Sequence, residues 1–479
     1  MIEKLKPYPA YKDSGVEWLG QVPAHWEVRR LGSVTQVLNG ATPSSSMPEY
    51  WDGDIVWVTP DDLGKLKGRY IDDSSRRITD EGYNACGTTL APAGSIVISI
   101  RAPIGHLGIL RVAACANQGC RLLIPQSGTV NEYLYHVLVA ARPSLEALGQ
   151  GSTFLELSRS KLRSFPVPHP PLPEQTAIVR FLDYMDRRIR RYIRAKQRLI
   201  KLLEEYKQAL IHQAVTGQID VRTGEPYPAY KDSGVEWLGK VPEHWDIVPN
   251  RAVLRLKKRL VGEASTDYTL LSLTKGGIVT RNLENPEGKF PTSFDTYQVV
   301  EPGDIIFCLF DIDETPRTIG LSSFYGMITG SYTVFECNDP IIRAYVYLFY
   351  LAMDDGKFLK PLYTGLRKVI TKSAFLAAKM PLPTKEEQTA IVEYLDAQTA
   401  KIDAAIAAAR REIELLREYR TRLIADVVTG KVDVREVAAQ LPEEPPEERE
   451  WMDTEEATEG EAADDEAVAE AFSEEEVAR

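Results

Sequence analysis

The sequence has 479 residues, of which 44% are hydrophobic and 26% are charged, a composition typical of a folded protein with room for two or three domains. No apolar run reaches membrane-spanning length and the N-terminus lacks a signal-peptide profile, so we expect a cytoplasmic protein with no membrane partner. The net charge of −12 comes from residues 437–479, which hold 17 Asp or Glu and two Arg, a net charge of −15. The remaining body carries +3, which permits a nucleic-acid partner but does not by itself indicate one.

The cysteines indicate a reducing compartment rather than a metal site. Their number is odd and none form a CxxC pair, so free thiols are expected. Cys115 and Cys120 have no second Cys or His pair at zinc-finger spacing. We therefore predict free thiols at positions 86, 115, 120, 308 and 337, with Cys115 and Cys120 buried in apolar surroundings.

The chain begins with a block that is repeated later. Residues 7–28 return as residues 226–247 with 18 identities in 22 positions. The Gly, Pro and aromatic content favours an irregular segment held by Trp and Tyr side chains rather than a helix. A purely architectural role and a docking role both remain open for this block.

Between the start block and the next repeat lie residues 29–173 and 248–386, which differ in sequence but keep one order of predicted elements. Each half is predicted to contain, in this order, a turn and buried strand, an apolar helix, a Gly-containing polar loop, a short helix and a Pro-bounded strand. In the first half the turn and strand, the apolar helix, the polar loop and the Pro-bounded strand are expected at residues 92–100, 132–141, 149–153 and 165–168. In the second half the same four elements are expected at 302–310, 341–353, 363–368 and 380–383. The short helix is expected between the polar loop and the last strand of each half. The irregular alternation of strands and helices predicts α+β domains.

A second repeat follows each domain. Residues 174–222 and 387–435 share 25 identities in 49 positions, and each copy predicts a long helix that ends at a glycine, Gly217 or Gly430. Apolar residues at alternating steps of three and four predict a coiled-coil seam. The first helix is rich in Arg and Lys and the second leans acidic, which favours an antiparallel pair within the chain. Two separate helices, or a basic helix lying on DNA, are the alternatives. Because the second copy opens with residues 381–387 instead of a tight Pro-Leu-Pro-Glu, we expect its N-terminus to start differently.

No motif of a catalytic site is present in the sequence. A Walker A motif, a GxGxxG motif between strand and helix, and an amino-methyltransferase signature are all absent, and Glu287-Gly288-Lys289 lacks the acidic partner that a nuclease requires. His25 and His244 are repeat equivalents beside Trp and are interpreted as packed or hydrogen-bonded. We predict no catalytic, cofactor-binding or metal-binding residue in this chain.

Polar, Gly-rich loops offer candidates for contacts with DNA, because phosphates bind Lys and Arg while base edges bind Arg, Asn, Gln, Lys, Ser and Thr. Each candidate is also open to the interpretation of an ordinary solvated surface residue. The predicted DNA-binding residues of the first half are Asn39, Thr42, Ser44, Lys65, Lys67, Arg69, Arg76, Arg77, Arg101, Asn117, Gln118 and Ser152. Those of the second half are Lys257, Lys258, Lys275, Arg281, Arg317, Arg367, Lys368 and Lys372.

The start blocks and the long helices with their closing residues together form a duplicated frame. This frame resembles the specificity subunit of type I restriction–modification systems. The residues that carry the resemblance are the Pro-Leu-Pro-Glu-Gln-Thr-Ala-Ile run at 171–178 and its copy at 387–391, both Val-Thr-Gly closings, the start blocks with Trp18, Trp26, Trp237 and Trp245, and the runs at 101–105 and 117–119. The match covers residues 7–436.

The resemblance implies two α+β target-recognition domains joined by two long antiparallel coiled-coil helices, with a pseudo-twofold internal repeat and an acidic, disordered C-terminal tail. The domains are expected at residues 1–170 and 223–380, the helices with their connectors at 171–222 and 381–436, and the tail at 437–479. Each domain would read half of a bipartite, asymmetric site in double-stranded DNA. The helices would set the spacing and dock two methyltransferase subunits, which restriction–translocase subunits join. S-adenosylmethionine and ATP with magnesium would belong to those partners.

Two other classes of function remain open from the sequence. A stand-alone DNA-modifying enzyme would need a catalytic site that the motifs do not reveal. An architectural coiled-coil adaptor would bind proteins only, and the two large, divergent domains with basic loops argue against it.

Overall fold

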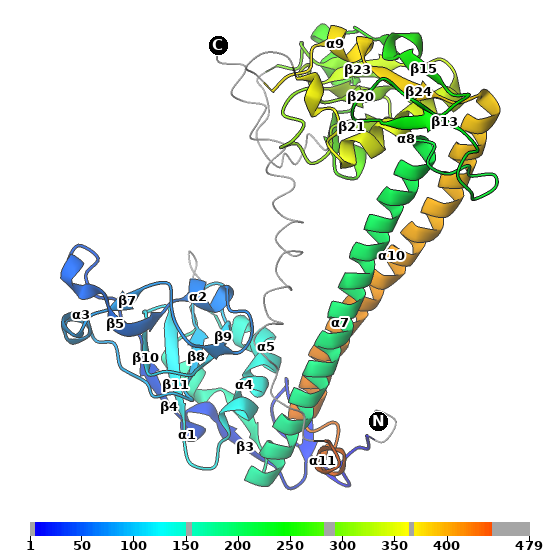
Figure 1. Cartoon of the computed structure of the whole chain (residues 1–479). Helices are drawn as coiled ribbons and strands as arrows, with labels where there is room; N and C mark the ends of the chain where they lie inside the picture. The colour runs from blue at the N-terminus through cyan, green and yellow to red at the C-terminus, as the bar shows by residue number, and fades with distance from the viewer. Residues whose placement is uncertain (1–4, 150–155, 282–292, 364–367, 443–479) are drawn as a thin grey trace. The chain divides into compact units, whose positions relative to one another are not determined.

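The computed structural model describes residues 5–149, 156–281, 293–363 and 368–442 (Figure 1). The chain divides into two compact units: residues 1–195 with 411–452 form unit 1, and residues 196–410 with 453–479 form unit 2. Helices α7 (Leu172–Val215) and α10 (Lys385–Val428) each contribute one part to both units. Predicted residues Ser152 and Arg367 lie outside the described residues.

Each start block forms a short antiparallel hairpin followed by a strand. In unit 1, β1 (Tyr11–Asp13) pairs with β2 (Gln21–Pro23), and β3 (Glu27–Arg30) pairs with β12 (Pro166–His169). Trp26, which follows the hairpin, is fully buried, as is its equivalent Trp245. The predicted clamping by aromatic residues is therefore confirmed, with a short hairpin added. The equivalents in unit 2 are β13 (Tyr230–Asp232), β14 (Lys240–Pro242), β15 (Asp246–Pro249) and β24 (Lys379–Leu382).

Both units contain a central sheet with the same order of its first four strands. The order is β4-β11-β8-β9-β6 in unit 1 and β16-β23-β20-β21 in unit 2. The strands of unit 1 are β4 (Thr35–Asn39), β11 (Cys120–Pro125), β8 (Ile96–Ser99), β9 (Leu107–Leu110) and β6 (Tyr70–Ile71). Those of unit 2 are β16 (Arg255–Leu256), β23 (Thr333–Glu336), β20 (Ile305–Phe307) and β21 (Ile319–Leu321). The predicted order along the chain is confirmed separately, because in each unit the buried strand (β8 or β20) is followed later in the chain by an apolar helix, a short helix and the Pro-bounded strand (β12 or β24).

Further strands and short helices complete each unit. Unit 1 has a second sheet of order β10-β5-β7, made of β10 (Ala114–Ala116), β5 (Trp51–Val58) and β7 (Arg77–Ile78). Unit 2 has the pairs β17 (Leu271–Thr274) with β18 (Gly277–Thr280) and β19 (Gln298–Val300) with β22 (Gly326–Ile328). The shorter helices of unit 1 are α1 (Leu31–Val34), η2 (Pro48–Tyr50), α2 (Pro60–Gly64), α3 (Asp80–Ala85), α4 (Asn131–Ala140), α5 (Arg142–Ala147), α6 (Arg159–Ser164) and α11 (Arg435–Ala439). Those of unit 2 are η3 (Asn250–Ala252), η4 (Gly262–Asp267), α8 (Pro340–Asp355), η5 (Lys360–Leu362) and α9 (Lys372–Ala377).

The central strand of each sheet is buried on both faces, which explains its continuous apolar sequence. In β8, Ile96 and Ile98 pack with residues of α4 and α7, while Val97 packs with residues of the second sheet. In β20, Ile305 and Phe307 pack with residues of α8, and Ile306 packs with Leu271 and other residues of a separate cluster. The long helix is thus part of the core of each domain.

The two long helices have the same length and begin at equivalent positions. Each spans 44 residues, so the expectation that the second helix starts differently is wrong. The reason is a capping box: the Thr384 hydroxyl accepts from the Glu387 amide at 3.3 Å, and the Glu387 carboxylate accepts from the Thr384 amide at 3.4 Å. This box caps the start of α10 at the position where Pro171, Leu172 and Pro173 open α7.

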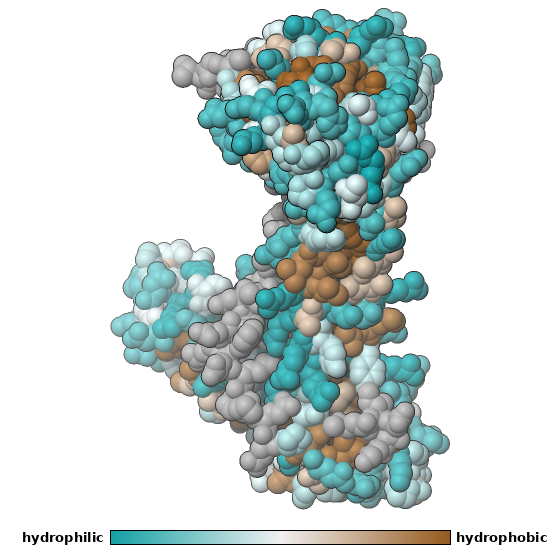
Figure 2. All heavy atoms as spheres, turned by 45° about the vertical axis from the view of Figure 1, so that its right-hand side comes forward, coloured by the Kyte–Doolittle hydropathy of each residue, from teal (hydrophilic) through white to brown (hydrophobic). Residues whose placement is uncertain are grey.

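Within each unit, the parts of α7 and α10 contact each other. In unit 2, Lys207 pairs with Asp403 at 2.7 Å and Glu204 with Arg410 at 3.1 Å, so the two helices run in opposite directions there. In unit 1, Asp186 pairs with Arg420 at 2.5 Å. In the Arg410 and Arg420 pairs the cation lies on α10, opposite to the predicted charge bias. The bias describes the average charge of each helix, whereas an ion pair depends on the two residues that face each other. Figure 2 shows hydrophilic and hydrophobic side chains on the exposed surface of the long helices. The large apolar or aromatic side chains exposed on α7 include Tyr192, Leu199, Leu202 and Tyr206.

The structure corrects where the predicted tail begins. Residues Arg435–Ala439 form α11, and Val437, Ala438 and Leu441 are buried in the core of unit 1. Val437 and Ala438 are the buried residues of this short helix and Leu441 follows it; the acidic composition of the later residues obscured this apolar pattern. Among the described residues, no helix has the length and apolar character needed to cross a membrane. All five cysteines are free, and Cys115 and Cys120 are buried, as predicted. Cys308 and Cys337 are buried as well, and Cys86 is half-buried.

Candidate nucleic-acid interface

Three of the loops predicted to contact DNA meet at one end of the central sheet of unit 1. Strand β4 ends at Asn39, β8 ends at Ser99 and β11 begins at Cys120. The register places Asn39 opposite Arg121, and Cys120 opposite Ser99. Loops 39–44, 101–105 and 117–119 therefore leave the sheet side by side, although they are far apart in the sequence.

Two of these loops are held against each other by short backbone contacts. The Ala41 amide donates to the Ala116 carbonyl at 2.9 Å, and the Thr42 hydroxyl donates to the side-chain oxygen of Gln118. A Cβ at Gly40 would lie 1.9 Å from the Asn117 carbonyl oxygen, so this approach requires glycine. The Asn117 side chain accepts from the Gly119 amide at 2.9 Å and fixes the turn. Thr42 and Gln118 are thus presented as an ordered polar pair.

Arginines surround this polar pair. Arg101 pairs with Glu156 at 3.0 Å, with side chains 46% and 39% exposed, and so remains accessible to solvent. Arg121 donates to the Gln118 carbonyl at 3.2 Å, and its Nε is buried with no hydrogen-bond partner among the described residues. Burial lowers the pKa of Arg121; Glu156 acts to raise it, while Arg159 and Arg101 lower it further. The cluster can offer guanidinium groups to phosphates or base edges.

Sequence reasoning missed Arg121 and Arg159. Arg159 begins α6 and donates to the Val37 carbonyl at 2.7 Å, which brings it to the same sheet. Arg121 interrupts the buried run of Cys120, Leu122 and Leu123, and a charged residue inside such a strand was the available signal. The position of Arg159 could be found only from the tertiary structure.

Several of the other predicted residues of unit 1 are engaged within the unit. Arg69 makes a two-pronged contact with Asp183 of α7 at 2.5 and 2.9 Å, and Arg76 stacks 3.6 Å from the ring centre of Trp51. The remaining contacts are Lys65 with Asp61 at 2.8 Å, Arg77 with Asp73 at 2.9 Å, and Ser44 with Ser46 at 2.8 Å; Lys67 is exposed on the loop after α2. A DNA contact by any of these side chains stays a prediction.

The Arg69–Asp183 pair is expected to make the stability of unit 1 depend on acid. Burial acts to raise the pKa of Asp183, but the hydrogen bonds and charges of His136 and Arg69 lower the pKa to about 2. A carboxyl pKa depressed on folding contributes stability above its unfolded value of 3.8, which is lost as pH falls toward 2. We expect Asp183→Asn to remove about 2 kcal/mol at pH 6 and little at pH 2, measured by denaturant unfolding. Asp61→Asn, which breaks the exposed pair with Lys65, is the matched control. An equal loss at both pH values would contradict the assignment.

One backbone hydrogen bond after the central strand is found at equivalent places in the two units. Ile370 N donates to Leu309 O at 2.7 Å, as Leu157 N donates to Ile100 O at 2.8 Å in unit 1. Lys368 lies just before Ile370 and pairs with Asp313 at 3.2 Å and with Glu314. Leu157 and Ile370, which precede the short helices α6 and α9, are therefore bonded at equivalent places.

Two predicted residues of unit 2 are built into ion-pair networks. Lys257 is 13% exposed and contacts Glu301 at 2.8 Å and Asp304 at 2.7 Å; Arg317 is 19% exposed and contacts Asp354 at 3.3 Å and Asp355 at 2.9 Å. Both side chains are thus engaged within unit 2, and a DNA contact by either stays a prediction. The others lie near strand or helix ends: Lys258 after β16, Lys275 between β17 and β18, Arg281 after β18, and Lys372 at the start of α9.

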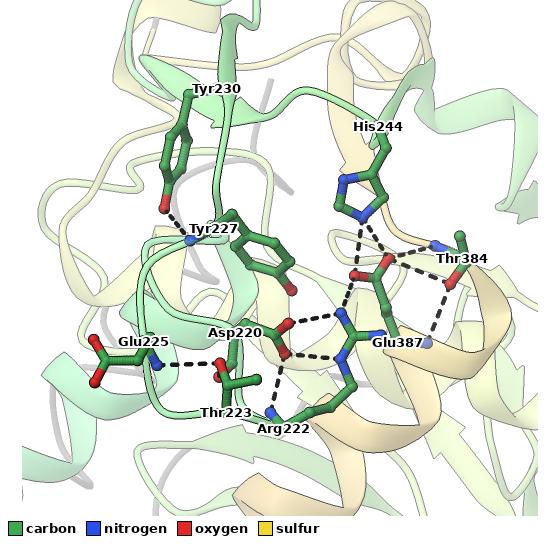
Figure 3. A network of polar contacts seen from close by, with 9 residues as sticks. All are labelled: Asp220, Arg222, Thr223, Glu225, Tyr227, Tyr230, His244, Thr384 and Glu387. Atoms are coloured by element: carbon green, nitrogen blue, oxygen red, sulfur yellow. Dashed lines mark hydrogen bonds and ion pairs between the residues drawn. The ribbon is translucent and has the colours of Figure 1, made fainter.

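Buried carboxylates hold each frame together, and Figure 3 shows the network of unit 2. Glu387 lies within 2.9 Å of His244 and 3.0 Å of Arg222, which also pairs with Asp220 at 2.7 Å. Burial raises the pKa of Glu387, but His244, the Thr384 amide and Arg222 bring it below its ordinary value. In unit 1, Glu174 accepts from Tyr8 at 2.5 Å, lies 2.9 Å from His25 and accepts from Trp26 at 3.0 Å. The interpretation of both histidines as hydrogen-bonded is confirmed.

These observations define the class as an internally repeated protein with two α+β domains and two long helices that join their cores. Residues 23–201 match the family model described as the type I restriction modification DNA specificity domain. The resemblance found in the sequence is thereby confirmed.

The chain is also similar to individual proteins named as type I specificity subunits. The chain is 38% identical over 170 residues to the type I restriction enzyme MjaIX specificity subunit of Methanocaldococcus jannaschii, covering 35% of this chain and 39% of that protein. It is 22% identical over 452 residues to the MjaVIII specificity subunit of the same organism, covering 87% of this chain and 95% of that protein. The alignments with the relatives at 38%, 30% and 27% identity span less than half of those proteins, at 39%, 42% and 46% of their lengths.

A solved structure shares the fold. The chain aligns with one from a study of the structural basis underlying complex assembly and conformational transition of the type I R-M system. The TM-score is 0.61 and the sequence identity is 18%. The alignment covers 85% of this chain and 98% of that chain. At this identity the likeness shows the fold alone.

Proposed function

We propose that this protein is the non-catalytic DNA-specificity subunit of a type I restriction–modification complex, acting in the cytoplasm. Each α+β domain reads one half of a bipartite, asymmetric site in double-stranded DNA. The observation that carries this proposal is the meeting of loops 39–44, 101–105 and 117–119 at one sheet end, where Thr42, Gln118, Arg101 and Arg121 lie together. Polar side chains that are ordered by a rigid sheet and flanked by arginines suit base-edge and phosphate contacts.

The long helices set the distance between the two half-sites. In this proposal α7 and α10 pair as an antiparallel coiled coil, supported by the opposite run of the Lys207–Asp403 and Glu204–Arg410 contacts. A helix of this length is a rod of roughly 60 Å, while successive faces of the major groove recur about every 34 Å. A stiff connector of that size suits two domains that bind separated half-sites.

The partners in this proposal supply the chemistry. Two methyltransferase subunits dock on the helices, and restriction–translocase subunits complete the assembly. S-adenosylmethionine, ATP and magnesium belong to those partners, and the buried carboxylates of the frame are fully engaged in holding start blocks to helices. The tail from residue 443 has no assigned part in DNA binding.

The proposal is tested by mapping methylated sites in cells that carry this chain with its native partners. The wild-type chain is expected to direct a split, asymmetric motif. Gln118→Ala should relax one or more positions of one half-site and leave the other half unchanged, because a lost base contact removes about 1–3 kcal/mol of discrimination. Gln21→Ala, an exposed glutamine of the start block, is the matched control.

Several outcomes would contradict the proposal. A contiguous motif, or relaxation of both halves by Gln118→Ala, would remove the division of labour between domains. Methylation or cleavage by the purified chain alone would identify a stand-alone enzyme. Loss of this chain without any change in methylation would favour a protein-only adaptor.

A further inference from the structure

The first part of α7 carries exposed cations along one side. Arg180, Arg188 and Arg191 are exposed, and their spacing of eight and three residues places them on one side of an α-helix. Tyr192, next to them, is 56% exposed. The opposite side, with Ile178, Leu182, Met185 and Ile189, is buried. On the cationic side itself, Tyr184 is also buried and accepts a hydrogen bond from Arg188 at 2.9 Å, so the exposed part of this side consists of the arginines and Tyr192.

The described chain ends beside this surface. Leu441 is 5% exposed in the core of unit 1, and its carbonyl oxygen accepts a hydrogen bond from Arg180 Nη2 at 2.5 Å. Only Pro442 follows among the described residues. The described part of the chain therefore ends next to Arg180 of α7.

The sequence of the segment from residue 443 onward complements this side of α7 in charge and in apolar character. Residues 443–453 read Glu-Glu-Pro-Pro-Glu-Glu-Arg-Glu-Trp-Met-Asp, with six acidic residues and one Arg. Trp451 and Met452 add two large apolar side chains that match the exposed ring of Tyr192. We propose that residues 443–453 lie on the cationic side of α7 formed by Arg180, Arg188, Arg191 and Tyr192.

Length and electrostatics support this occupant. Eleven extended residues reach about 35 Å, whereas Arg180 and Arg191 are separated by about 17 Å along a helix. Tethering next to Arg180 makes the contact intramolecular and keeps the segment at high local concentration. Several exposed ion pairs of small individual strength then add up, and salt weakens them. A partner that binds this side of α7 must displace the segment.

Zero-length carbodiimide coupling in the full chain tests the proposal. Arg191→Lys keeps the charge and provides an amine, and mass spectrometry is expected to find this amine joined to carboxyl groups of residues 443–453 within one chain. Lys207 and Asp403, 2.7 Å apart, provide the internal positive control for coupling and for folding of the helices. Mixing ¹⁴N- and ¹⁵N-labelled chains separates coupling within a chain from coupling between chains.

A charge-matched pair of tail variants isolates the acidic residues that the proposal needs. Replacing Glu443, Glu444, Glu447, Glu448 and Glu450 by Gln should lower coupling of the introduced amine to Asp453 about tenfold, since five weak ion pairs are lost. The same replacement at Glu466, Glu470, Glu474, Glu475 and Glu476 should leave that coupling unchanged. The proposal is overturned if both variants behave alike, if coupling occurs only between chains, or if the tail couples to lysines of the α+β domains while Lys207 still couples to Asp403.

Discussion

Glu174→Gln is expected to destabilise the frame of unit 1 by about 3 kcal/mol, because it leaves buried hydrogen-bond donors without an anionic acceptor. The Glu174 carboxylate is buried and accepts from the Tyr8 hydroxyl at 2.5 Å and the Trp26 indole at 3.0 Å, with His25 at 2.9 Å. A glutamine at this position has one oxygen that can accept a hydrogen bond, and its NH2 group would face a donor of Tyr8, Trp26 or His25. Hydrogen exchange measured by mass spectrometry on peptides of residues 7–28 reports the change directly.

The repeat supplies the matched comparison. Glu387→Gln should raise exchange in residues 226–247 and leave residues 7–28 protected. Its effect should be smaller, because the indole nitrogen of Trp245 has no hydrogen-bond partner among the described residues and so gives the carboxylate no bond to lose. Glu17→Gln, an exposed residue of the same start block, should change neither peptide. Equal exchange in wild type and Glu174→Gln would show that the carboxylate does not hold the frame.

The second large effect is expected at the glycines that close the long helices. Gly430 has φ of +78°, and a Cβ there would lie 2.3 Å from Pro23 Cδ and 3.1 Å from Trp26. Gly217 has φ of +73° and meets Pro242 at 2.4 Å and Trp245 at 3.0 Å in the same way. Gly430→Ala therefore combines left-handed backbone strain with a collision against a buried Trp-Pro corner, and we expect a loss of about 3 kcal/mol or more.

A second glycine separates strain from collision. Gly15 has φ of +70°, but nothing lies within 4 Å of a Cβ placed there. Gly15→Ala should cost only about 1–2 kcal/mol, the price of the left-handed conformation. Thermal unfolding of both variants, with hydrogen exchange of residues 7–28, measures the difference. Equal losses at positions 15 and 430 would mean that the approach to Pro23 and Trp26 contributes nothing.

These glycines also explain why the repeated sequences are so similar. Gly217 ends the first long helix yet packs on the second start block, whereas Gly430 ends the second helix and packs on the first. The arginines that follow these glycines also contact the other repeat. Arg222, after the first helix, lies near Glu387 of the second helix, and Arg435, after the second helix, lies near Glu174 of the first. Each frame is assembled from both repeats, so start block, helix opening and helix closing must stay mutually compatible while the domain loops are free to differ.

The sequence by itself determined the duplicated frame, the two long helices, the buried central strands and the burial of Trp26 and Trp245, because each depends on local periodicity or on a repeated motif. It also identified loops 39–44, 101–105 and 117–119 by composition. The tertiary structure decided that these loops meet, that Arg121 and Arg159 join them, and that Arg69, Lys257 and Arg317 are bound by carboxylates. Lys and Arg look alike in a sequence whether they face solvent or a buried acid. Only the packing of distant segments gives them their partners.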